Sequence, residues 1–165
     1  MTQPPEVRRY RGFLAHTARA AYATVVVTAA IAAEAAVLED WGSWHFLGTL
    51  FLTLAVLFFA EVYSEVLGDE ANLSFRQRMR SATNEHWAVF EAGIPLAVPL
   101  VLGGLGVIST ETAVWGVLEV AVLALGLWGG LAAANRDRPA SRIALAVTAS
   151  MLIGVVIILL KAIKF

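Results

Sequence analysis

Six ionisable side chains lie inside stretches of this chain that are otherwise apolar. They are Glu34, Glu61, Glu65, Glu91, Glu119 and Lys161. A charged group in hydrocarbon is costly unless it is paired, protonated or in contact with water. Ionisable residues at such positions are therefore the best indication of function in this sequence.

One group of these residues is expected to converge at one depth in the membrane. Glu61 and Glu65 lie one helical turn apart on one face. Glu91 lies about one turn inside a later apolar stretch, shortly after Glu85 and His86. Carboxylates with a nearby histidine suit a divalent cation, which needs oxygen ligands and neutralised charge, and they suit a proton equally well. The predicted ligands of a metal ion are Glu61, Glu65, Glu91 and His86.

A simpler interpretation of the same group also exists. Glu65 and Glu85 would then lie at the level of the lipid headgroups and pair with Arg76, Arg78 or Arg80. His86 would be an interfacial residue rather than a ligand. Glu61 and Glu91 lie too deep for this interpretation and are expected to line a polar cavity.

Two prolines follow Glu91 in the same apolar stretch. Pro95 and Pro99 cannot donate backbone hydrogen bonds, so they release the carbonyls of Glu91 and Pro95 and are expected to kink the helix. Irregular backbone beside a carboxylate is typical of ion sites in transporters. The alternative is a kink whose free carbonyls bind a neighbouring hydroxyl group or water.

The remaining ionisable residues are expected toward the opposite side of the membrane. Glu119 shares a helical face with small residues, which predicts that it packs against another helix rather than lipid. Glu34 and Lys161 also lie on faces rich in small residues. We predict an ion pair or triad of Glu34, Glu119 and Lys161, in which one carboxylate titrates or all three form a static tether. The face of Glu119 includes Gly116, Leu123, Gly126 and Gly130. The face of Glu34 includes Ala20, Ala23, Val27 and Ala30, and the face of Lys161 includes Ser150 and Gly154.

The elements that position these residues are membrane-spanning helices. The chain has 165 residues, of which 59% are hydrophobic and 15% charged, and its mean hydropathy is +0.73. A soluble domain cannot bury so much apolar surface, whereas a membrane helix needs about 20 apolar residues. We predict an all-α, polytopic helix bundle that forms one domain over residues 1–165. Its five transmembrane helices are expected at 17–38, 45–67, 87–108, 112–134 and 143–163.

Basic residues predict the orientation of the bundle, because basic flanks are retained in the cytoplasm. Arginines precede the first span and occupy the connections between spans two and three and between spans four and five. The other two connections have no lysine or arginine. The sequence therefore predicts a cytoplasmic N-terminus, an external C-terminus and basic loops that bind anionic lipid.

Composition also argues against several functions. The chain has no cysteine, which excludes disulfides and thiolate metal ligands. It has no phosphate-binding glycine loop, no Gly-x-Ser-x-Gly motif and no His-Glu-x-x-His motif. With a net charge of −1, it offers no basic surface for nucleic acid. We expect no enzyme activity, no nucleic-acid partner and no required cofactor apart from a bound divalent cation.

Five short motifs resemble those of a group of small five-helix integral membrane proteins from high-GC bacteria. The motifs are FAEVYSE (59–65), NEHW (84–87), EAGIP (91–95), TAVW (112–115) and IILLK (157–161). The resemblance covers the last four predicted spans. It implies a bacterial inner-membrane protein with glutamates inside the membrane, and it implies no particular activity.

Three functional hypotheses remain open at this point. The first is an ion channel or transporter, working as a homo-oligomer, that moves a cation or proton past the glutamates. The second is a membrane subunit or scaffold without transport activity, in which the same charges pair helices. The third is a membrane enzyme with a carboxylate-bridged metal centre, which needs glutamate and histidine ligands from facing helices.

Overall fold

The computed structural model describes residues 5–37, 41–68, 74–134 and 139–162. Within these ranges the chain forms six helices and no strand. The helices are α1 (Pro5–Val37), α2 (Ser43–Gly68), α3 (Phe75–His86), α4 (Ala88–Gly104), α5 (Thr110–Ala134) and α6 (Ala140–Ala162).

Five stretches of these helices are long and apolar enough to cross a membrane. The first two lie in α1 and α2, the third combines the end of α3 with α4, and the last two lie in α5 and α6. The predicted all-α bundle of five spans is therefore confirmed. The stretches are Leu14–Val37, Ser43–Leu67, Met79–Gly104, Thr110–Ala134 and Ala140–Leu159.

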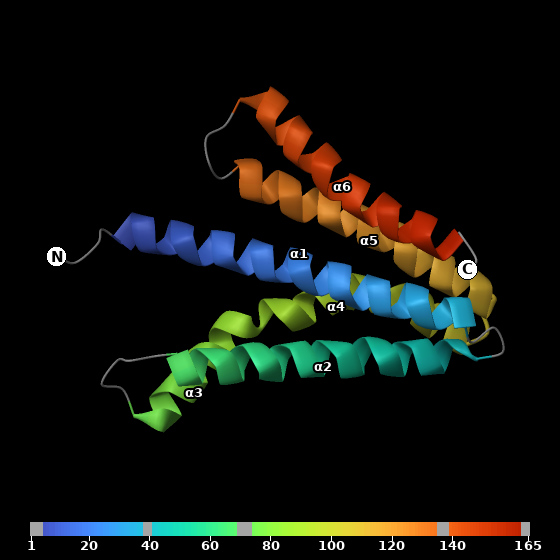
Figure 1. The fold of residues 1–165 in the computed structure, drawn as a ribbon, viewed down its shortest axis with the longest axis horizontal. Coiled ribbons are helices and arrows are strands. Elements are labelled where there is room, and N and C mark those ends of the chain that lie inside the picture. The colour runs from blue at the N-terminus through green and yellow to red at the C-terminus, as the bar shows by residue number, and fades with distance from the viewer. Residues whose placement is uncertain (1–4, 38–40, 69–73, 135–138, 163–165) are drawn as a thin grey trace.

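Helix α1 is the central element of the bundle. It runs between the α5–α6 pair and the α2–α4 pair and packs against all four helices (Figure 1). Its packing face is made of small residues, and Ala20, Ala23, Val27 and Ile31 are fully buried. In α1, 39% of the most apolar window is buried, against 11% in α6. Neighbouring helices thus surround α1, the span that is rich in alanine.

The outside of the bundle is apolar as well. Large hydrophobic side chains are exposed along the spans, a pattern that suits lipid rather than water as the surrounding solvent. Examples are Phe51, Leu52, Phe59, Ile94, Leu145 and Leu152.

Helix α3 occupies a segment that we expected to be a basic loop, residues 68–86. A capping box starts it: Ser74 Oγ accepts a hydrogen bond from the Gln77 backbone N–H, and Gln77 Oε1 accepts one from the Ser74 N–H. This arrangement satisfies backbone donors that the first turn leaves free. Helix α3 lies at the same end of the bundle as the start of α1, the end of α5 and the start of α6 (Figure 1).

Helix α4 ends at Gly104, four residues earlier than predicted. The backbone N–H of Val107 donates to the carbonyl of Leu102, and that of Gly106 donates to Gly103. Gly106 has a φ of 75°, a left-handed conformation that glycine adopts readily. The glycine-rich segment therefore closes the helix with a C-terminal cap.

Both predicted kink residues lie inside α4. The helix runs from Ala88 to Gly104 and includes Pro95 and Pro99, so the predicted kink would be a bend within one helix and stays a prediction. Pro99 is buried and lies close to Gly116 of α5. A glycine at this position lets α4 and α5 approach closely beside the proline ring.

Candidate functional site

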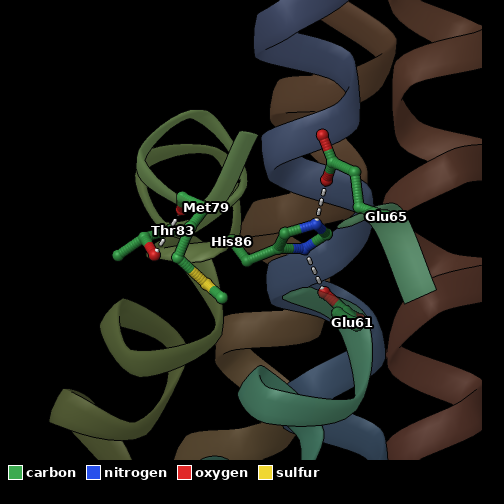
Figure 2. A network of polar contacts seen from close by, with 5 residues as sticks. All are labelled: Glu61, Glu65, Met79, Thr83 and His86. Atoms are coloured by element: carbon green, nitrogen blue, oxygen red, sulfur yellow. Dashed lines mark hydrogen bonds and ion pairs between the residues drawn. The ribbon is translucent and has the colours of Figure 1, made fainter. Parts of the chain in front are cut away.

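His86, the last residue of α3, lies between two carboxylates of α2 (Figure 2). Its Nδ1 atom is 2.6 Å from Glu61 Oε2, and its Nε2 atom contacts Glu65 Oε2. The His86 side chain is only 6% exposed, and that of Glu61 is 22% exposed. The prediction that Glu61 and Glu65 share one face of their helix is confirmed, because both reach the same imidazole ring.

Hydrogen bonds from one imidazole to two carboxyl groups would need an additional proton. A neutral imidazole has one N–H donor and one acceptor nitrogen, and a carboxylate can only accept. A ring that hydrogen-bonds to two carboxyl groups is therefore an imidazolium, or one of the two carboxyl groups is protonated. A cluster that makes both hydrogen bonds would hold one proton more than a neutral histidine with two carboxylates.

The position of α3 explains why His86 reaches this place. Ala82 and His86 lie one turn apart on the same face of α3, and both are buried against the bundle. On α2, Glu61 lies seven residues before the end of the helix, which corresponds to a depth of about 10 Å. The cluster thus lies inside the span, near the end that the arginine pattern predicts to be cytoplasmic.

Glu91 does not join this cluster. Its Oε2 atom lies 2.9 Å from Nε2 of His16 on α1, and both side chains are partly exposed. Glu91 is in the first turn of α4, where the helix dipole favours a negative charge. The structure therefore divides the predicted inner group into a His86 cluster and a His16–Glu91 pair. The side chain of Glu85 lies outside the described residues.

A further pair lies at the opposite end of the bundle. His45, near the start of α2, places its Nε2 atom 2.8 Å from Glu34 Oε1, near the end of α1. The Trp41 ring lies against His45, with 3.9 Å between the ring centroids. The second oxygen of Glu34, Oε2, is buried and has no hydrogen-bond partner among the described residues. The predicted partners of Glu34 were Glu119 and Lys161, whereas the structure pairs it with a histidine.

Glu119 is exposed on α5, so no described helix of the same chain covers the face that we predicted to pack against another helix. The stripe of small residues does contact neighbouring helices near its ends, where Gly116 meets α4 and Gly126 meets α6. Glu119 and Leu123 lie between these two contacts and are exposed. Lys161 belongs to α6, but its side chain lies outside the described residues.

Sequence reasoning found the glutamates but missed the role of the histidines. The chain has three histidines, and each contacts a glutamate inside a span. A usable signal was present, since each histidine lies within a few residues of the end of an apolar stretch, at the depth of a glutamate. The sequence indicates His86 either as a ligand beside Glu61, Glu65 and Glu91 or as an interfacial residue. It predicts no glutamate partner for His16 or His45.

No group of three or more metal-ligating residues arranged to hold a metal ion is found in the described part of the chain. At the His86 cluster, each ring nitrogen faces a different carboxylate, so the imidazole bridges the two acids rather than sharing one centre with them. A single metal ion bound by all three residues would need a different arrangement of these side chains.

The fold and the site define a multi-pass membrane protein, a helix bundle whose spans carry histidine–glutamate contacts near both ends. Comparison with known protein families, curated proteins and solved structures finds no match to this chain. The resemblance to small membrane proteins of high-GC bacteria therefore remains an expectation based on the short motifs.

Proposed function

We propose that this chain is a small cation transporter or channel of the bacterial inner membrane, and that the proton is the ion it moves. The His86 cluster is the observation that carries the proposal. It places an imidazole between two carboxyl groups within a membrane span, an arrangement that can hold and exchange a proton. A polar network of this kind inside hydrocarbon is costly to maintain, and such groups mark proton relays in membrane proteins.

The proposed pathway uses histidine–glutamate groups at both ends of the bundle. At the predicted cytoplasmic end, the proton binds the cluster of Glu61, Glu65 and His86, and the His16–Glu91 pair lies on the neighbouring helices α1 and α4. At the other end, the unpartnered Oε2 of Glu34 supplies an acceptor beside His45. Glu119 contributes a carboxylate from α5. An imidazole can release a proton from one nitrogen and bind another on the opposite nitrogen, which suits a relay.

Two alternatives remain as outcomes of the test. The histidine–glutamate contacts join α3 to α2 and α1 to α2, so they also suit a scaffold that holds helices together without transport. The other alternative is a bound divalent cation, either transported or held in an enzyme, with Glu61, Glu65, Glu91 and His86 as the ligands after rearrangement.

The decisive experiment is ion flux into proteoliposomes that contain a pH-sensitive dye and, separately, a dye sensitive to divalent cations. We expect the native chain to acidify the vesicles under a membrane potential, and Glu61→Gln to reduce this flux by more than about tenfold. Glu111→Gln is the matched control, because Glu111 is exposed in the first turn of α5, outside the proposed pathway.

Each other result has a definite meaning. Native protein that moves no proton and no divalent cation would refute transport and favour the scaffold. Flux of a divalent cation without proton flux would replace the proton by a metal ion. Stoichiometric iron or manganese in purified protein that carries no ion would favour the enzyme.

A further inference from the structure

An apolar groove lies between α2 and α3. Its volume is about 590 Å³, which lies within the range of ligand sites in proteins. Its wall on α2 runs from Phe58 to Leu67, and its wall on α3 includes Met79 and Thr83. The Thr83 hydroxyl already donates to the backbone carbonyl of Met79 at 2.8 Å (Figure 2). Tyr63 supplies the remaining hydroxyl group of the lining, so the groove suits a hydrocarbon ligand.

The groove has the length and position of one lipid chain. From Phe58 to Leu67 the α2 backbone rises by about 14 Å, and one leaflet of the hydrocarbon core is about 15 Å thick. Leu67 lies next to the end of α2, so the groove begins at the membrane surface and runs toward its centre. Phe59, Tyr63 and Leu67 are each about two-thirds exposed, so the groove opens toward lipid.

Positive charge lies directly beside the surface end of this groove. Arg76 and Arg80 are both exposed on α3, and no ion pair holds either of them in the described part of the chain. Arg76, Met79, Arg80 and Thr83 are spaced by three and four residues, so they lie on one side of the helix. The two arginines therefore lie on the side of α3 that carries Met79 and Thr83 of the groove wall.

We propose that this groove binds one anionic phospholipid, whose acyl chain lies between α2 and α3 and whose phosphate pairs with Arg76 and Arg80. The apolar lining selects a hydrocarbon chain, and the two guanidinium groups select a negatively charged headgroup, since Arg pairs with phosphate through two parallel hydrogen bonds. The site uses residues of α3 other than His86, and it does not depend on the proposal of transport.

The test uses the purified full chain with an equimolar mixture of phosphatidylglycerol and phosphatidylcholine, and native mass spectrometry to count retained lipids. We expect the native protein to retain phosphatidylglycerol about tenfold more than phosphatidylcholine, and Arg76→Gln with Arg80→Gln to remove this preference. Ala60→Phe should reduce retention of both lipids, because Ala60 lines the groove and a phenyl ring would fill it.

Matched controls separate the site from general effects. Arg142→Gln removes an exposed arginine from the first turn of α6, at the same end of the bundle, and Val56→Phe enlarges an exposed residue of α2 outside the groove. Neither control should change retention, and glycerol phosphate should not displace the lipid, because it lacks the chain. Equal retention of the two lipids by native protein, or normal retention by a folded Ala60→Phe variant, would overturn the proposal.

Discussion

At the scale of single residues, the main feature of this protein is that its histidines contact glutamates within the spans. Each of the three histidines contacts a glutamate on another helix. A single ionised carboxylate is costly inside a membrane, whereas an acid that shares a proton with an imidazole has lost most of its net charge. The contacts therefore solve two problems at once: they make deep glutamates tolerable and they provide groups that exchange protons.

His86→Ala is expected to destabilise the protein by about 1–3 kcal/mol, because it leaves the Glu61 and Glu65 carboxylates in the span without their partner. The thermal unfolding midpoint in detergent would measure this loss. Adding Glu61→Gln and Glu65→Gln to the same variant should recover much of the stability, since the unpaired acids are then gone. Both variants should have lost the proton flux that we expect of the native chain. If the triple variant were no more stable than His86→Ala, the cost would come from lost packing rather than from unpaired acids.

The limits of the sequence are also clearest at this scale. The depth of Glu61 and Glu91 follows from the length of the apolar stretches, so their place inside the span could be predicted. The identity of their partners could not, because His16 and Glu91 are 75 positions apart and meet only when α1 packs against α4. For Glu119, the stripe of glycines predicts that α5 packs closely against its neighbours. It does not predict that α4 and α6 each cover only part of the stripe and leave Glu119 exposed between them.

Helix α3 is the distinctive element of the fold. It links two spans, carries His86 and, through Met79 and Thr83, forms one wall of the apolar groove. The five long helices could be predicted because long apolar runs are a strong signal. Helix α3 is short and polar, and its only clear signal in the sequence was the Ser74-x-x-Gln77 capping box.

Ser74→Ala is expected to reduce the stability of α3 by about 1 kcal/mol, because it removes one half of the capping box. Amide hydrogen exchange in α3 should therefore become about fivefold faster, with no change in α2. Ser81→Ala is the control, since Ser81 is exposed in the interior of the same helix. Equal exchange rates in the two variants would show that α3 is held by its contacts with α2 and not by its cap.

At the scale of the whole molecule, the described part of the bundle leaves the Glu119 side chain exposed deep inside a span. Glu119 lies nine residues after the start of α5, about 13 Å into the span, and its side chain is exposed. Its neighbours Leu123 and Leu127 are exposed as well. Because a carboxylate near the centre of a bilayer is costly in contact with lipid, we propose that a second copy of the chain covers this face of α5.

This proposal predicts that a cysteine at position 123 forms a disulfide between two copies of the chain, whereas a cysteine at position 56 does not. The chain has no cysteine, so Leu123→Cys provides a single reactive thiol on the Glu119 face. A symmetric dimer brings equivalent residues near the two-fold axis together, and mild oxidation in native membranes should then give a covalent dimer. Val56→Cys, on the exposed face of α2, should stay monomeric under the same conditions. A monomer in both cases, including with a short thiol cross-linker, would mean that the α5 face meets lipid or another protein.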